Sequence, residues 1–337
     1  MRFGPVPLAE AAGAVLAHSE GVAGGRLRKG AVLGPADLAV LAAAGLTEVV
    51  VARLDPGDVA EDAAAARLAA ALVPDPAGQG LAIGPAFTGR VNLNAARAGL
   101  AQVDAAAVHR LNRIHPAITL ATLAPLARVT PGTLAGTVKI ISYAVPGDAL
   151  ALACEAARAA LRILPVTRPD AGLILTEVPG QEAKLTAKGL RVTEARLKAL
   201  GMALAGVEVV AHDEAAIAAA LGRLPGAMAL ILTGSATSDL HDTAPQAVRL
   251  AGGHVLRFGM PVDPGNLLFL GEQAGRPVLG LPGCARSPAL NGADWVLERL
   301  ICGVPVSAAD IAGMGVGGLL KEIPTRGRLR EAPKQVL

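Results

Sequence analysis

The feature that most constrains the fold is a regular alternation of short apolar runs with helical segments between positions 171 and 301. The apolar runs predict strands at 171–176, 207–211, 227–232, 267–270 and 277–281. Helical spacing predicts helices at 184–200, 214–221, 243–250 and 287–301. Such alternation is typical of a parallel sheet with helices on both faces. We therefore predict a three-layer, doubly wound, mostly parallel α/β domain in this half of the chain.

In the rest of the chain, predicted strands and helices alternate less regularly. The 337 residues suggest two domains. We predict an N-terminal α+β domain over 1–166, the α/β domain over 167–305, and a C-terminal arm or linker over 306–337. In the N-terminal part, spacing and turn signals predict helices at 8–18, 34–44, 58–72, 104–114 and 148–160, and strands at 47–52, 118–123 and 134–144.

Composition excludes several functional classes. Aromatic residues make up only 2% of the chain, which leaves little surface for stacking nucleic-acid bases. The net charge of +3 is too small for a protein that binds a phosphate backbone. No apolar run approaches the roughly 20 residues that a membrane span needs. The three cysteines form no close pair, and no secretory segment is evident, so we expect a cytoplasmic protein.

Three loops rich in small residues stand out between positions 228 and 287. They cover 233–242, 259–266 and 280–287, and two of them directly follow apolar runs. Few bulky side chains stand in the way there, so backbone can approach a ligand closely. In a parallel sheet such loops meet at the carboxyl ends of the strands, where ligands bind. The three loops therefore predict one pocket.

The first loop carries hydroxyl and carboxylate groups. Thr233, Ser235 and Thr237 offer hydroxyls, and Asp242 lies at the end of the loop. Hydroxyls and backbone N–H groups suit a phosphate or a polar heterocycle, and an Asp beside them can hold Mg²⁺. Asp242 is equally well placed to cap the helix that follows. One residue can do both, and the two interpretations stay open.

The third loop is predicted to enter a helix directly at Ser287. Free N–H groups and the helix dipole then form an anion site. Gly283 would allow close approach, Arg286 would add a charged fork, and Ser287 would add a hydroxyl. The alternative is a tight turn between strand and helix with a solvated Arg286.

At these loops the chain resembles the molybdopterin-binding superfamily, which includes molybdopterin adenylyltransferases, molybdotransferases and competence-damage-type proteins. Thr233-Gly234-Ser235-Ala236-Thr237 is similar to the family's Thr-Gly-Gly-Thr-Gly pattern, with Asp242 at the family's Asp. The segment 280–287 is similar to Gly-Leu-Pro-Gly-Asn-Pro-x-Ser of the molybdotransferases, and Asp263-Pro264-Gly265-Asn266 falls on their Lys-Pro-Gly-Lys motif.

The resemblance extends beyond the loops, but several residues of this chain differ from the family's motifs. Positions 25–49 look like the segment that precedes the binding domain in molybdotransferases. Ser235 and Thr237 replace glycines, and Asp263 and Asn266 replace both lysines. The acidic motif after the first strand is reduced to Thr176-Glu177.

The resemblance implies a molybdopterin-binding protein of molybdenum cofactor biosynthesis or maturation. Its ligand would be molybdopterin or another molybdenum cofactor form. The residues implied in binding are Thr233, Gly234, Ser235, Asp242, Pro264, Gly265, Gly283, Arg286 and Ser287. No metal is implied in this reading.

Two alternatives remain. In one, the chain is a transferase acting on molybdopterin, with Asp242 and Glu177 placing Mg²⁺. In the other, it is a module that docks onto a nucleotidyltransferase or a molybdoenzyme. The resemblance also implies a homo-oligomer. Composition and charge leave neither nucleic acid nor membrane as an expected partner.

Overall fold

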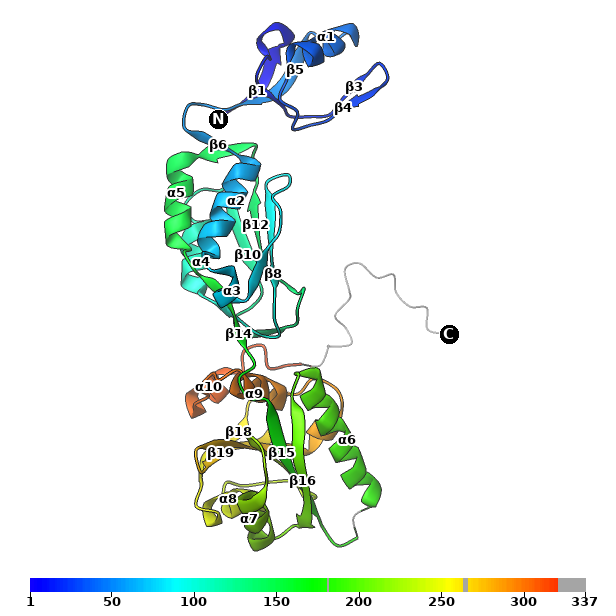
Figure 1. Ribbon diagram of the computed structural model, residues 1–337, viewed down its shortest axis with the longest axis vertical. Coiled ribbons are helices and arrows are strands. Elements are labelled where there is room, and N and C mark those ends of the chain that lie inside the picture. Colours follow the sequence, from blue (N-terminus) through cyan, green and yellow to red (C-terminus); the bar gives the residue numbers. More distant parts are fainter. Residues whose placement is uncertain (181, 263–265, 321–337) are drawn as a thin grey trace. The chain divides into compact units, whose positions relative to one another are not determined.

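The computed structural model describes residues 1–180, 182–262 and 266–320. The chain divides into two compact units, residues 1–165 and 166–337, and each is described by itself. Several sheets and helices alternate along the chain, which makes it a mixed α/β protein (Figure 1). Within the described ranges, no helix is both long and apolar enough to cross a membrane.

The first unit begins with a small sheet of order β1-β5-β2. Its elements are β1 (Arg2–Pro7), the 3-10 helix η1 (Leu8–Glu10), β2 (Val15–Leu16), the hairpin β3 (Glu20–Val22) and β4 (Gly25–Leu27), α1 (Pro35–Ala43) and β5 (Glu48–Arg53). The predicted helix at 34–44 and strand at 47–52 are observed. The predicted helix at 8–18 is wrong, because Gly13 takes a left-handed φ of 74° and β2 then pairs with β5.

The remainder of the first unit contains a four-stranded antiparallel sheet of order β10-β12-β8-β7. Its strands are β7 (Leu81–Ile83), β8 (Arg90–Ala95), β10 (Ile118–Thr122) and β12 (Leu134–Ile140). A three-stranded sheet has the order β11-β9-β14, and β13 pairs with β6. Those strands are β6 (Asp58–Ala60), β9 (Gly99–Val103), β11 (Ala127–Val129), β13 (Ala144–Pro146) and β14 (Leu161–Pro165).

Helices cover one face of the four-stranded sheet. They are α2 (Glu61–Leu72), α3 (Pro76–Gln79), α4 (Ala105–Asn112) and α5 (Gly147–Ala156). α2 packs against β8 and β12, and α4 packs against β10. Leu68 and Leu72 of α2 join Leu93 of β8 and Val138 of β12 in one buried cluster. Alternate residues of a strand point to opposite faces, so Arg90, Asn92 and Asn94 lie on the other face of β8.

Several strands of this part were not predicted. β8 reads Arg-Val-Asn-Leu-Asn-Ala, and its apolar positions are buried while Arg90 and Asn92 are exposed. Asn is depleted in strands, so the alternation is weak as a local signal. Pairing with β12 and β7 on either side decides that the segment is a strand.

The second unit is built on a six-stranded sheet of order β16-β15-β17-β20-β19-β18. Its strands are β15 (Asp170–Glu177), β16 (Ala203–Ala211), β17 (Ala229–Leu232), β18 (His254–Met260), β19 (Asn266–Gln273) and β20 (Arg276–Leu281). The pairs β15–β16, β15–β17 and β17–β20 are parallel. β19 is antiparallel to both β20 and β18.

The expectation of a mostly parallel sheet therefore fails at one edge. β19 and β20 are joined by Ala274 and Gly275 alone, with φ angles of 52° and 78°. A two-residue turn with positive φ at both positions forms a tight hairpin, whereas parallel strands need a long crossover. The sequence pattern predicts 267–270 and 277–281 as successive parallel strands and predicts no strand at 254–260, where β18 forms.

Helices pack against both faces of this sheet. They are α6 (Ala183–Ala199), α7 (Glu214–Arg223), α8 (Thr243–Leu250), α9 (Gly292–Ile301) and α10 (Ala308–Gly313). Residues of α7 and α8 cluster with Ile174 and Ile231. Gly189 of α6 lies against Leu175 and Leu232, whose side chains point to the opposite face. Part of the arm predicted at 306–337 is α10, and residues 321–337 lie outside the described residues.

The predicted helix at 287–301 begins five residues late. Gly283–Arg286 forms the 3-10 helix η2, and α9 starts at Gly292 with Asn291 as its cap. Ser287 precedes Pro288 and is extended, with φ −86° and ψ 143°. A residue before proline is disfavoured in the helical region, which explains the delay.

We predict that Gly280→Ala destabilises the second unit. Gly280 lies opposite Phe269 on β19, and a Cβ at this position would come within 2.1 Å of the phenyl ring. Overpacking of this kind costs about 1–3 kcal/mol of unfolding free energy, measured by urea denaturation. Gly222→Ala in α7 is the control, because nothing lies within 4 Å of its added Cβ. Equal stability of the two variants would contradict the packing described.

Candidate functional site

The predicted site lies where three neighbouring parallel strands end. β15, β17 and β20 are adjacent in the sheet, and their last residues are Glu177, Leu232 and Leu281. The loops that follow β17 and β20 therefore start side by side at one edge. Parallel pairing brings together residues about 50 positions apart in sequence. This edge is where open α/β sheets bind ligands.

Thr176 joins three segments at this edge. Its side chain is buried, with 1% exposed, and its Oγ1 accepts a hydrogen bond of 2.8 Å from the backbone N–H of Gly234. The same oxygen lies 2.9 Å from Nδ1 of His212, which follows β16. One hydroxyl therefore connects the end of β15, the loop after β17 and the residue after β16.

Some polar groups of the first loop form hydrogen bonds within the protein and are not free for a ligand. Thr233 is buried, and its hydroxyl donates to the carbonyl of Ser235 at 2.5 Å. Ser235 is exposed, and Gly234 is partly buried with its N–H held by Thr176. Thr233 thus shapes the loop, and Ser235 is the residue of this group that faces solvent.

Asp242 is the N-cap of α8. One carboxylate oxygen accepts the N–H of Thr243 at 2.7 Å, and the other accepts the N–H of Ser238 at 2.8 Å. Partial burial by itself raises the pKa of Asp242. The hydrogen bonds from Ser238 and Thr243, with the charge of His212, outweigh burial and lower that pKa. Of the two roles left open for Asp242, the structure shows the cap.

Arg286 lies on η2 and reaches back to the end of β17. Its Nη2 donates to the carbonyl of Thr233 at 2.6 Å. Its Nε is buried and has no hydrogen-bond partner among the described residues. Burial lowers the pKa of the guanidinium, which records the cost of removing a charge from water. Arg286 is therefore a half-buried cation whose buried Nε has no acceptor among the described residues.

Gly283 and Ser287 flank this arginine. Both are exposed, and a Cβ on Gly283 would lie 3.8 Å from Nη1 of Arg286. The oxygen Oγ of Ser287 accepts the N–H of Ala289 at 3.3 Å. Because α9 begins at Gly292, the helix N-terminus predicted at Ser287 is not there, and the anion site inferred from it must rest on Arg286 instead.

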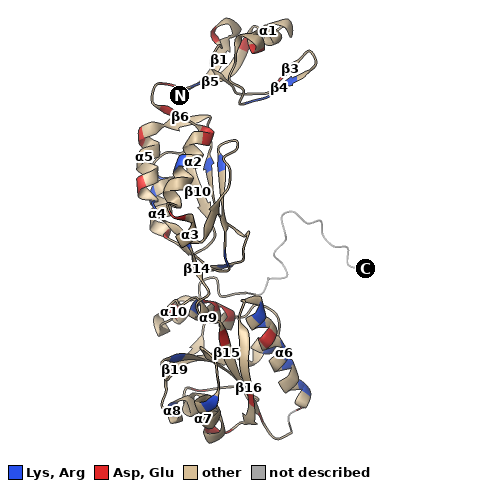
Figure 2. Ribbon diagram, viewed as in Figure 1, with Lys and Arg blue, Asp and Glu red and all other residues tan. Residues whose placement is uncertain are grey.

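Arg196 of α6 holds the third loop in place. Its guanidinium donates to the carbonyls of Ala285 at 2.8 Å, Ser287 at 3.0 Å and Ala289 at 3.2 Å. It also forms an ion pair with Asp294 of α9, and both side chains are about 90% buried. Lys and Arg are prominent along α6 in Figure 2. Arg196 is the member of that group that fixes the conformation of the loop.

The remaining predicted site residues are Glu177, a candidate for placing Mg²⁺, and Pro264 and Gly265 of the second loop. Glu177 is exposed, and its Oε1 accepts the hydroxyl of Thr186 at 2.8 Å. No group of three His, Cys, Asp or Glu side chains suited to a metal was found in the parts of the chain that the structure describes. Pro264 and Gly265 lie outside the described residues.

His212 is a site residue that no local sequence pattern indicates. His241, within the first loop, is exposed, and its N–H donates to Asp239. His212 instead contacts Thr176 and lies close enough to Asp242 to lower its pKa. The signal that could have found it is its place directly after a strand that pairs in parallel with β15.

Comparisons with known proteins were made against families, curated sequences and solved structures. Residues 5–53 match a family model described as a domain of unknown function (DUF8806). No curated protein matches the chain. This family match covers the small sheet and α1 at the start of the first unit, and does not extend to the strand-end loops.

Two solved structures show partial likeness. The crystal structure of the molybdopterin biosynthesis moea protein from Pyrococcus horikosii is 14% identical, with a TM-score of 0.28, over 93% of this chain and 76% of that chain. A molybdenum cofactor biosynthesis protein from Pyrococcus furiosus is also 14% identical, with a TM-score of 0.21, over 93% of this chain and 65% of that chain. Likeness at these scores is too low to establish a shared fold.

We predict that Asp242→Ala lowers the unfolding free energy by about 1 kcal/mol at pH 7, because the cap of α8 is lost. The folded-state pKa of Asp242 is depressed. Its stabilisation is therefore present above the unfolded pKa and disappears as pH falls through the folded pKa. Urea denaturation from pH 7 to pH 3 should show the gap to wild type closing. Asp242→Asn, which keeps an acceptor without a titrating group, is the control. A gap that stays constant would contradict the assigned role.

We predict a larger loss for Arg196→Met. The substitution leaves the buried carboxylate of Asp294 without its cation and three carbonyls without their donor. Breaking a buried ion pair on one side costs about 3–5 kcal/mol, measured by urea denaturation. Arg191→Met on the exposed side of α6 is the matched control and should cost far less. Similar losses in both variants would show that Arg196 does not anchor the loop.

Proposed function

We propose that the second unit binds molybdopterin or another molybdenum cofactor form at the carboxyl ends of β15, β17 and β20. The observation that carries the proposal is Arg286, a half-buried arginine whose Nη2 donates to the Thr233 carbonyl and whose buried Nε has no partner among the described residues. A buried charge is costly unless an opposite charge or full hydrogen bonding compensates it. An anionic ligand group supplies that compensation.

The surroundings of Arg286 favour a phosphate. The guanidinium presents its donors in a planar fork that matches phosphate oxygens. Gly283, which lies over Nη1, has no side chain to block access. Ser235 and Ser287 are exposed on the two loops that flank the arginine and offer hydroxyls to polar ligand atoms.

The choice of molybdopterin comes from the sequence motifs that surround this arginine. Thr233-Gly234-Ser235 and Gly280-Leu281-Pro282-Gly283 are the segments that resemble the molybdopterin-binding superfamily. They follow two directly paired strands, β17 and β20. Segments similar to two motifs of one family thus lie beside the unsatisfied cation. Pro264 and Gly265 belong to the proposal as the rim of the pocket.

Binding is favoured over group transfer because the carboxylates of Asp242 and Glu177 already accept hydrogen bonds within the chain. Both oxygens of Asp242 accept backbone hydrogen bonds, and Glu177 accepts the Thr186 hydroxyl. Mg²⁺ would have to compete with these donors. In this proposal the protein holds the cofactor and hands it over, as a cytoplasmic homo-oligomer that docks with a nucleotidyltransferase or a molybdoenzyme. Its three free cysteines suit a reducing compartment.

The test is a titration of the purified chain with molybdopterin, with and without ATP and Mg²⁺, that follows both binding and nucleotide consumption. We expect saturable binding without consumption. Arg286→Ala should weaken it about tenfold to a hundredfold, since a hydrogen bond to a charged group contributes roughly 1.5–3 kcal/mol. Arg286→Lys should recover only part of the loss, because it keeps the charge without the fork.

The matched control is Arg191→Ala, which removes an exposed cation from α6. Its affinity for molybdopterin should equal that of wild type. Unchanged affinity in a folded Arg286→Ala variant would overturn the assignment of the phosphate. Nucleotide consumption that disappears in Asp242→Asn would support the transferase alternative instead.

A further inference from the structure

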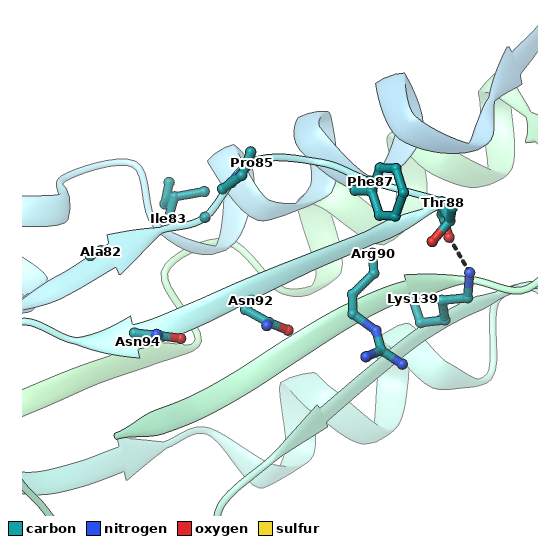
Figure 3. A pocket seen from close by; sticks show the side chains of 10 residues that line it. Ala82, Ile83, Pro85, Phe87, Thr88, Arg90, Asn92, Asn94 and Lys139 are labelled. Carbon is teal, nitrogen blue, oxygen red and sulfur yellow. Dashed lines mark hydrogen bonds between the residues drawn. The ribbon is translucent and has the colours of Figure 1, made fainter. Parts of the chain in front are cut away.

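A second candidate site lies in the first unit, on the face of the four-stranded sheet that the helices leave uncovered. A cavity of about 650 Å³ opens there, a size typical of small-molecule sites. Arg90, Asn92 and Asn94 of β8 and Lys139 of β12 line it (Figure 3). Every residue of the cavity wall belongs to 82–139, so the cavity is independent of the strand-end loops of the second unit.

Two cations lie opposite each other on this face. Arg90 and Lys139 are cross-strand partners in the β8–β12 register. Like charges directly opposite each other are destabilising. Neither forms an ion pair within the described ranges, and no acidic residue lines the cavity. Burial raises the pKa of Glu61 on α2, and the charge of Lys139 lowers it. Glu61 and Asp62 line an adjoining cavity that also includes Lys139.

A tight turn fixes the position of Arg90. Thr88 and Gly89 have φ angles of 49° and 70°, and Phe87 and Arg90 exchange two backbone hydrogen bonds across them. The ammonium group of Lys139 donates to the carbonyl of Thr88 at the same turn. The backbone of Arg90 and the ammonium group of Lys139 are therefore both held at this turn, at one end of the cavity.

The other end of the cavity presents amides. The Oδ1 of Asn92 accepts the Thr137 hydroxyl at 3.0 Å, so its NH₂ group is left as donor. The Oδ1 of Asn94 is buried and has no partner among the described residues. Ala82, which also lines the cavity, is the cross-strand neighbour of Asn94. A ligand N–H or O–H group would satisfy the Oδ1 of Asn94.

We propose that this face binds an organic phosphate of nucleotide size. The phosphate lies between Arg90 and Lys139, and a hydrogen-bond donor at the far end of the ligand meets Asn94. Arg90 to Asn94 spans about 13 Å at roughly 3.3 Å per strand residue, so inorganic phosphate is too short to reach both ends. The fork of Arg90 and the compact charge of Lys139 both suit phosphate oxygens.

The test is isothermal titration of the full chain with AMP, inorganic phosphate and adenosine. We expect AMP to bind more tightly than inorganic phosphate, and adenosine to bind weakest. Arg90→Gln and Lys139→Gln should each raise the Kd for AMP at least tenfold. Asn94→Leu should raise the Kd for AMP and leave that for inorganic phosphate unchanged.

Arg162→Gln is the matched control, since it removes one exposed cation of the first unit outside the cavity wall. Its Kd for AMP should equal that of wild type, and so should that of Arg286→Ala, which separates this site from the one in the second unit. No saturable binding of AMP, equal binding of AMP and inorganic phosphate, or equal effects of Arg90→Gln and Arg162→Gln would each overturn the proposal.

Discussion

The parallel pairing of β15, β17 and β20 is the constraint on which the candidate site of the second unit depends. It places the ends of these strands at one edge, although Thr176, Gly234 and Arg286 are far apart in sequence. Two contacts then tie the edge together: the N–H of Gly234 on the Thr176 hydroxyl, and Arg286 on the Thr233 carbonyl. Without this pairing neither contact is possible.

Some polar groups at that edge have hydrogen-bond partners within the chain, and others do not. The groups with partners have structural roles, and those without are the candidates for binding. Asp242, Arg196 and the hydroxyl of Thr233 have complete partners within the chain. They fix loops and cap a helix. The Nε of Arg286 lacks a partner, and so does the Oδ1 of Asn94 in the first unit. Buried polar groups are nearly always hydrogen-bonded. Thr193 Oγ1 and Asn266 Nδ2 are the other unpartnered buried atoms in the described part of the chain; Arg286 and Asn94 are the two that the proposals assign to ligands.

Individual residues show how far the sequence predicts the site. The loop after β17 is visible because small and hydroxyl residues follow a buried strand, and Asp242 as a cap was one of two readings left open. The helix start at Ser287 was mispredicted, because Pro288 holds Ser287 extended. His212 and Arg196 were not identified. Each acts through contacts with residues 30 to 100 positions away in sequence, and no local pattern marks such partners.

Hydrophobic periodicity and glycine content act locally, so the strand–helix alternation of the second half and its small-residue loops can be predicted from the amino-acid order alone. Other features depend on contacts between distant segments. The Ala274–Gly275 hairpin turned β19 antiparallel, and neighbouring strands made β8 a strand in spite of its asparagines. Only the folded sheet set Arg90 opposite Lys139 and buried Arg286 beside Thr233. Register and burial arise from contacts between distant segments, and these contacts exist only once the chain is folded.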